Sequence, residues 1–374
     1  MGNYSPKTSS SPNERYVLGQ TLELTLRLAP TATELQENEF VNPSTWLYIK
    51  LLEWELRHRH LPTATCIRGR ALSVQQSIAQ AMPFKQNNDD SVTLTHPSGS
   101  SAKVLLYGAT VISWEVEGKE RLFLSSKAKL DGTKAVRGGI PLVFPVFGKA
   151  TEGPAAALPQ HGFARTSTWE LLGIKNDNDD VVAVQFGLEV ENIDLEAQKQ
   201  WPYKFGLIYT VELGKDTLKN TMEIRNDADA EDFDFQILFH SYLAVGDVSD
   251  VEVKGLEKVD YRDKTQGGKV LTQAAESEAR LDITSETDRL YVAPSGTSTT
   301  VLEKDQAVVE VQRQNLKDVV VWNPWEKAPQ NMGDFGPEDG WKRMICVEAG
   351  SVAEWHKLKK GDSWTGSQVL KALL

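Results

Sequence analysis

Short runs in which apolar and polar residues alternate recur from Ser91 almost to the end of the chain, and they restrict the folds it can form. Examples are SVTLT, SAKVLLY, TVISWEV, VVAVQFGLEV and DFDFQILFH, and turn signals such as Pro-Ser-Gly and Glu-Gly-Lys separate them. A period of two is typical of strands that bury one face, and short strands joined by turns form antiparallel meanders. No long helical period interrupts the series, which argues against a parallel βαβ sheet. The sequence therefore predicts an all-β protein, built as a large antiparallel β-sandwich.

The composition of the first 81 residues differs from that of the remainder. Residues 1–15 are rich in Ser, Pro and Asn, which predicts disorder, and residues 44–60 carry apolar groups at helical spacing after a potential N-cap at Ser44. A sandwich of about 250 residues or more can form one domain. We therefore predict a disordered N-terminal extension with a short helix over residues 1–81 and one domain over residues 82–374.

The net charge limits the kinds of partner that the chain can bind, and the cysteine content indicates the compartment in which it functions. The net charge is -11, from 41 Lys and Arg against 52 Asp and Glu, which disfavours nucleic acid and anionic membranes. The two cysteines, Cys66 and Cys346, form no disulfide framework and suit a reducing compartment. Neither a membrane span nor a secretory signal is indicated. We expect a cytoplasmic protein that is a monomer and binds a small molecule.

Polar side chains that could bind a ligand concentrate between residues 137 and 170, beside residues that bend the backbone: Arg137, Gly138, Gly139, Pro141, Pro145, Gln160, His161 and Arg165. Taken singly, each arginine is more often a surface charge, and His161 more often a core histidine. However, the apolar run IPLVFPVFG would bury its neighbours, and a half-buried arginine needs an anionic partner. The combination therefore predicts a shaped loop that binds an oxygen-rich anion.

Two strand ends supply further candidates. In DFDFQILFH the period of two places Phe233, Phe235, Ile237 and Phe239 on one face, so His240 points away from the main core. A lone histidine at a strand end is usually structural. In MICVEAG the apolar residues run up to Glu348. A carboxylate there is either paired with a cation or poised in a cleft, because burial alone raises its pKa.

The motifs VRGGIPLVFPVFG and LPQHGFARTSTWE resemble the aldose 1-epimerase superfamily, in particular its hexose-6-phosphate 1-epimerase branch, and the resemblance runs from about residue 83 to the C-terminus. It implies a galactose mutarotase-like supersandwich with the substrate on a concave sheet face. It also implies that His240, in LFHSYL, is the catalytic histidine and that Glu348 is the general base. Asp288, in ETDRLY, matches a contact to a sugar hydroxyl. Trp322 is either a platform beneath the sugar or a core residue, with Asn323 beside it.

The implied reaction is the interconversion of α and β anomers by ring opening, with Glu348 as base and His240 as acid. One carboxylate and one imidazole suffice for it, each contributing roughly 10²- to 10⁴-fold in rate. His161 and Asp288 would orient hydroxyls, while Arg137, Gln160 and Arg165 would bind the phosphoryl group. We predict no cofactor and no metal, since nucleotide-binding loops and Cys/His ligand spacings are missing from the sequence.

Three alternatives stay open. An epimerase for unphosphorylated aldoses would leave two arginines without an anion. A non-catalytic carbohydrate-binding sandwich would have no need of Glu348 and His240 as a pair, although a sandwich by itself says nothing about activity. A glycosidase would need two carboxylates about 5 to 9.5 Å apart, and Asp288 prevents its outright exclusion.

Overall fold

The computed structural model describes residues 83–177, 180–227, 231–273 and 281–373. The predicted extension over residues 1–81, its helix over residues 44–60 and Cys66 lie outside the described residues, so these stay predictions. In the described ranges no helix is both long and apolar enough to cross a membrane.

The described part consists of three antiparallel sheets, as the alternating runs predict. The first contains β1 (Phe84–Gln86), β2 (Ser91–Thr95), β3 (Ser101–Leu105), β4 (Val111–Val116) and β5 (Lys119–Glu120) in chain order. The second has the order β16 (Leu281–Asp282), β13 (Val251–Lys254), β18 (Ser298–Glu303), β19 (Gln306–Gln314), β22 (Ser363–Ala372), β10 (Thr217–Asn226), β9 (Phe205–Leu213), β8 (Val182–Glu189) and β7 (Glu170–Asp177). A short helix, α5 (Leu195–Gln200), follows β8 in the chain.

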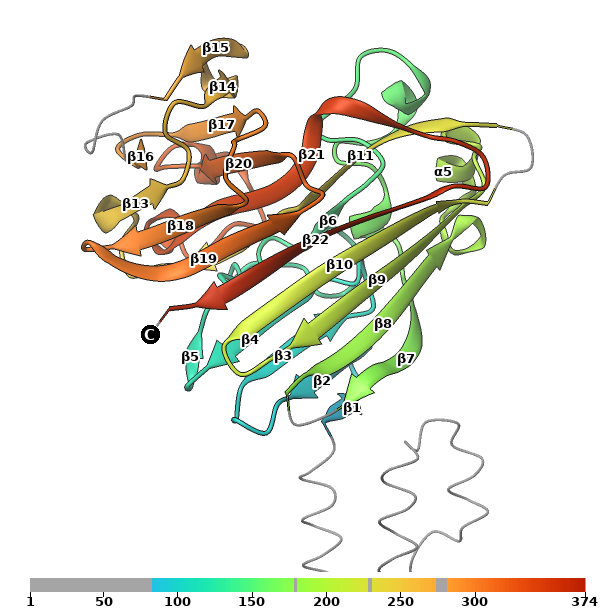
Figure 1. The fold of residues 1–374 in the computed structure, drawn as a ribbon, viewed down its shortest axis with the longest axis horizontal. Coiled ribbons are helices and arrows are strands. Elements are labelled where there is room, and N and C mark those ends of the chain that lie inside the picture. Colours follow the sequence, from blue (N-terminus) through green and yellow to red (C-terminus); the bar gives the residue numbers. More distant parts are fainter. Residues whose placement is uncertain (1–82, 178–179, 228–230, 274–280, 374) are drawn as a thin grey trace, which may run out of the picture. The chain divides into compact units, whose positions relative to one another are not determined.

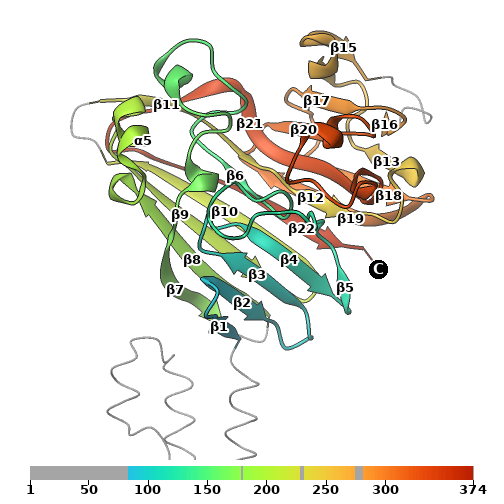
Figure 2. The ribbon, with the colours of Figure 1, turned by 180° about the vertical axis from the view of Figure 1, so that it is seen from behind.

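The third sheet carries the candidate site. Its order is β15 (Lys269–Thr272), β14 (Asp260–Asp263), β17 (Thr287–Tyr291), β20 (Asp318–Asn323), β21 (Met344–Leu358), β11 (Phe233–Phe239) and β6 (Leu142–Val143), and β12 (Tyr242–Ala244) also pairs with β21. The long strand β21 lies near the middle of this sheet, and the chain then turns back into β22 of the second sheet (Figure 1). In both views β2 to β4 lie across β8 to β10 (Figure 2).

One face of the third sheet is buried against the rest of the sandwich. The side chains of Phe235, Ile237 and Phe239 from β11 join the main core, which also takes Val104 from β3 and Phe186 from β8. Leu238, between Ile237 and Phe239, packs instead in a smaller cluster with Val320 and Val352. This alternation confirms the facing predicted for DFDFQILFH. It also defines a second face of the sheet, here called the outer face.

The chain between residues 137 and 170 is mostly loop, as predicted, with two short 3-10 turns, η1 (Pro154–Ala157) and η2 (Ala164–Thr166). The exception is β6, because Leu142 and Val143 pair with Phe239 and Leu238. Gly139 has φ 65, and a Cβ there would overlap the carbonyl oxygen of Val111. Glycine is needed at this position because the loop packs directly on the backbone of the first sheet.

Candidate active site

His240 and Glu348 meet on the outer face. Leu238 and Phe239 of β11 pair with Gly350 and Ala349 of β21, so the antiparallel register brings the next residue, His240, beside Glu348. Nδ1 of His240 lies 3.3 Å from Oε1 of Glu348, and both residues are buried. Among the described residues, neither His240 Nδ1 nor Glu348 Oε2 has a hydrogen-bond partner. The pair thus keeps unsatisfied polar atoms, which is costly in a core but useful for binding a substrate.

Aromatic rings fix the orientation of His240. The ring of Tyr242 stacks on it with a centroid distance of 4.7 Å and an interplanar angle of 11°. The rings of Trp322 and His161 approach it edge-on, each at a centroid distance of 5.9 Å. Trp322 therefore lies on the outer face beside the candidate pair and is available as a sugar platform.

Asn323 does not share this position. It is fully buried, and its Nδ2 donates to the carbonyls of Trp341 and Met344 at 2.9 and 2.8 Å. These bonds anchor the chain after β20, so Asn323 has a structural role rather than a place at the rim of the site.

His161 is held as a neutral hydrogen-bond donor. The N–H of Gly148 donates to its Nδ1 at 3.1 Å, so the proton of the neutral ring is on Nε2. Burial, together with the charges of Arg165 and Lys264, lowers the pKa of His161 to about 2. The side-chain amide of Gln160, the preceding residue, lies 3.4 Å from this Nε2. His161 can donate to a hydroxyl without taking a charge.

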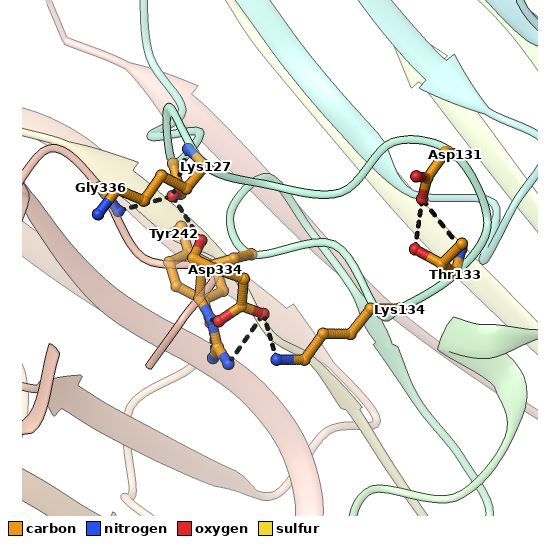
Figure 3. Close-up of polar contacts among 9 residues, drawn as sticks. Lys127, Asp131, Thr133, Lys134, Tyr242, Asp334 and Gly336 are labelled. Carbon is orange, nitrogen blue, oxygen red and sulfur yellow. Dashed lines mark hydrogen bonds and ion pairs between the residues drawn. The ribbon is translucent and has the colours of Figure 1, made fainter. Parts of the chain in front are cut away.

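Arg137 has a carboxylate partner within the chain, contrary to the expectation that both arginines would lack an anion. Its Nε and Nη2 donate to the two oxygens of Asp334 at 3.4 and 3.5 Å, and its Nη1 donates to the Tyr242 hydroxyl at 3.4 Å. Lys134 Nζ also contacts Asp334, at 3.0 Å (Figure 3). These long contacts leave the guanidinium of Arg137 only loosely engaged.

Arg165 is the arginine that keeps an unbalanced charge. Its Nη2 donates to the carbonyl of Gln160 at 2.8 Å, which places both residues of the predicted turn together. Its Nε is buried without a partner, and no carboxylate within the described ranges forms an ion pair with it. Burial lowers the pKa of Arg165, but a guanidinium stays protonated at physiological pH. A half-buried arginine in this state is suited to an anionic ligand.

Asp288 lies on β17 opposite Trp322 of β20, which places it on the outer face as well. Lys264 Nζ lies 3.3 Å from Asp288 Oδ1 and 3.9 Å from the centroid of the Phe147 ring. Burial raises the pKa of Asp288, and the charge of Lys264 opposes that shift. The structure thus adds Lys264 to the predicted set.

Three neighbours of the site escaped prediction: Tyr242, Lys264 and Asp334. Tyr242 is two residues beyond His240, so the alternation of the strand could have revealed it. Lys264 and Asp334 occur in polar stretches, DYRDKTQGG and MGDFGPEDG, where nothing in the local sequence separates them from surface charges.

The electrostatics of the pair suit proton transfer. Burial raises the pKa of Glu348 well above its usual value, although Lys264 opposes this. Burial and the neighbouring His161 and Arg165 lower the pKa of His240 well below 6.5. Both directions favour the uncharged form of each group, so in the unliganded protein the proton that the pair shares is on Glu348. One proton shared by two groups 3.3 Å apart allows one of them to act as acid and the other as base.

The two candidate residues and Cys346 also include residue types that bind metal ions. His240, Cys346 and Glu348 offer ligand atoms that all lie within 4.8 Å of one another. Arg165 and Lys264 act on the same groups with positive charge, which opposes a further cation. We assign no metal here, and the predicted absence of one stays a prediction.

An antiparallel sandwich that places an imidazole and a carboxylate side by side on one face of a sheet, 3.3 Å apart, is typical of an enzyme that moves protons on a small polar substrate. Comparison with known proteins specifies the class. The family model described as aldose 1-epimerase matches residues 90–371. A relative from Cenchrus ciliaris, named "Putative glucose-6-phosphate 1-epimerase", is 37% identical over 294 residues, which cover 76% of this chain and 85% of the relative.

Two further comparisons agree. A relative of the same name from Escherichia coli K12 is 32% identical over 294 residues, covering 78% of this chain and 93% of the relative. A crystal structure of a "putative mutarotase" from Salmonella typhimurium matches with a TM-score of 0.67 and 28% identity, covering 80% of this chain and 98% of that one. The chain belongs to the aldose 1-epimerase family. It is therefore an isomerase that acts on a carbohydrate, with the predicted galactose mutarotase-like fold.

The raised pKa of Glu348 has a consequence for stability. Because the folded state holds this proton more tightly than the unfolded state, stability is lost as the pH rises from the usual glutamate value through the folded-state pKa. We expect Glu348→Gln to avoid that loss. Near pH 8 its free energy of unfolding should be higher than that of the wild type by roughly 1–2 kcal/mol, which corresponds to a Tm higher by about 2–6 °C. The gain should vanish near pH 4, where both states are protonated. Thermal unfolding at both pH values measures it, and a gain independent of pH would contradict this account.

Proposed function

We propose that the protein is a hexose-6-phosphate 1-epimerase that interconverts the α and β anomers of glucose 6-phosphate. The observation that carries the proposal is Arg165, a half-buried guanidinium without a carboxylate partner among the described residues, whose charge acts on His240 and Glu348. A phosphoryl group would supply the missing anion. The names of the two relatives above, which refer to glucose 6-phosphate, support the same substrate class.

Ring opening needs one proton removed and one delivered. Glu348 takes the proton of the anomeric hydroxyl while His240 protonates the ring oxygen, and the bond between C1 and that oxygen breaks. Rotation about C1–C2 presents the other face of the aldehyde, and the two residues exchange roles as the ring closes. The aldehyde and its electrons stay on the sugar throughout, so no redox partner is involved.

The bound phosphoryl group would change the protonation of the pair. Burial lowers the pKa of His240, and the charges of Arg165 and Arg137 lower it further. Arg165 also lowers the pKa of Glu348, against the larger effect of burial. A dianion placed on the arginines offsets these charges and raises the pKa of both groups, so it helps the pair to keep its proton. The assignment of Glu348 as base and His240 as acid is the one that the family resemblance implies.

The remaining site residues would hold the sugar. His161 presents its Nε2–H to a hydroxyl, and the carboxylate of Asp288 accepts from another. Trp322 offers an aromatic face, and Gln160 adds an amide near the phosphoryl group. The role of Asp288 is the one that the family resemblance implies, and all four assignments form part of the proposal.

Saturation-transfer NMR tests the substrate class. We expect the enzyme to accelerate exchange between the anomers of glucose 6-phosphate much more than exchange between those of galactose or glucose at equal concentration. Exchange of galactose alone would favour the alternative, an epimerase for unphosphorylated aldoses. That alternative has one observation in its favour, because Asp334 already provides Arg137 with a counter-ion.

The compartment and the oligomeric state are also proposals. Cys346 is a free, buried thiol, which agrees with a reducing compartment such as the cytoplasm. We also propose a monomer, in which each chain carries a complete set of the residues assigned to catalysis and to the sugar.

A further inference from the structure

The two arginines proposed to bind the phosphoryl group belong to a cluster of four charged side chains: Lys134, Arg137, Arg165 and Asp334. Asp334 is almost fully buried, at 3% exposure, and is shared by Lys134 at 3.0 Å and Arg137 at 3.4 Å. Arg165 is connected to the same group through short contacts: it donates to the carbonyl of Gln160 beside His161, the His161 ring contacts that of His240, and Arg137 donates to Tyr242, which stacks on His240. Lys264 and Asp288, at 3.3 Å, compensate each other and add no net charge.

The net charge of this cluster is close in size and opposite in sign to that of a phosphate monoester. Three cations and one carboxylate leave a net charge of about +2, and a phosphate monoester carries about −1.5 to −2 at neutral pH. A sulfate monoester of the same sugar has the same tetrahedral shape but only one negative charge. A site of this net charge distinguishes the two esters electrostatically, because each positive charge acts on a dianion with twice the energy it has with a monoanion.

We propose that Lys134 and Asp334 are specificity-determining residues of the phosphoryl subsite: the charge of Lys134 strengthens the preference for a dianionic over a monoanionic ester, and the carboxylate of Asp334 limits it. The inference rests on the proposed function. Lys134 adds a third cation to the two arginines, while Asp334 pairs with Lys134 and Arg137 and cancels one of their charges. Asp334 thereby limits the affinity of the subsite for any anion and favours release of the phosphorylated product.

The carboxylate of Asp334 is not needed to hold its own loop. The hydroxyl of Ser125 donates to the backbone carbonyl of Asp334 at 2.7 Å and accepts from the N–H of Gly336 at 2.8 Å. Ser126 N–H also donates to the carbonyl of Gly336 at 3.0 Å. These backbone contacts do not involve the carboxylate, so the isosteric change Asp334→Asn keeps them while it removes the negative charge and replaces one acceptor oxygen with an NH2 donor.

The test compares glucose 6-phosphate with glucose 6-sulfate as competing ligands of the wild type, Lys134→Met and Asp334→Asn. The quantity measured is the ratio of their dissociation constants, and melting temperatures verify folding. We expect Lys134→Met to reduce the preference for the phosphate about threefold to tenfold, and Asp334→Asn to increase it by a similar factor. Asp334→Asn should also tighten binding of both esters.

Lys127→Met is the matched control. Lys127 is an exposed lysine of the same loop, its backbone N–H donates to Ser125 Oγ, and its side chain makes no ion pair with Asp334 (Figure 3). This variant has the same overall charge as Lys134→Met and should leave the ratio unchanged. An equal ratio shift in both lysine variants would mean that only the overall charge matters, and it would overturn the inference.

Two failures can be told apart. If the wild type binds glucose as tightly as glucose 6-phosphate, the proposed function fails. If the wild type prefers the phosphate but the two variants weaken both esters equally, Lys134 and Asp334 only support the arginines structurally. That second result would overturn the role of the two charges in ester specificity and leave the proposed function intact.

Discussion

Replacing Glu348 with Gln, or His240 with Asn, is expected to lower kcat for anomer exchange by roughly 10²-fold or more while the chain stays folded. Glutamine and asparagine retain much of the shape of the side chains but cannot exchange a proton at neutral pH. The two groups lie 3.3 Å apart and have polar atoms free of protein partners, so both are placed to act on one hemiacetal. Single-turnover or NMR exchange rates at saturating substrate measure the effect.

Glu354→Gln provides the matched control, because Glu354 lies on the same strand β21 with its side chain 86% exposed. This variant should turn over at the wild-type rate. The double variant of Glu348 and His240 should lose little more than either single one, because groups that act as a unit are not additive. Wild-type turnover in either single variant would refute the assignment of the pair.

The strand pattern was enough to predict how the third sheet is oriented. In β11 the alternating phenylalanines correctly assigned one face to the core, and the same period places Leu238 and His240 on the other. The pattern is informative here because the buried face of a strand must be apolar, so the order of apolar and polar residues within one strand shows which face is buried. It also explains why the neighbouring Glu348 and Cys346 share the outer face of β21 with Met344.

The charge pairs of the site could not be predicted in this way. Arg137 and Asp334 are 197 positions apart, and they meet only because the loop before β6 and the loop before β21 end near the same part of the third sheet. The expectation that Arg137 needs an external anion was reasonable from its apolar surroundings, yet the partner was inside the chain. The family resemblance predicted that residues far apart in the sequence belong to one site. The alternation within each strand predicted only the face of the sheet on which each residue lies.

Removing Arg165 is expected to reduce the preference for glucose 6-phosphate over glucose by roughly ten- to a hundredfold in kcat/KM, since a charged hydrogen bond contributes about 1.5–3 kcal/mol. The loss should be mainly in KM, because the phosphoryl group is remote from the reacting carbon and its contacts need not change in the transition state. Arg137→Ala should act in the same direction but less strongly, because Asp334 already engages that guanidinium at 3.4 Å. Kinetics with both sugars measure the two variants.

Lysine at position 165 should restore only part of the preference, because an ammonium keeps the charge but not the planar fork that binds two oxygens. Added salt should weaken binding of glucose 6-phosphate more in the wild type than in Arg165→Ala, since screening acts on the charge that the variant lacks. Arg343→Ala is the control, because Arg343 is 61% exposed and pairs only with Asp339 at the surface. If Arg165→Ala slows glucose and glucose 6-phosphate equally, the guanidinium holds the fold or the sugar ring, and the phosphoryl assignment is wrong.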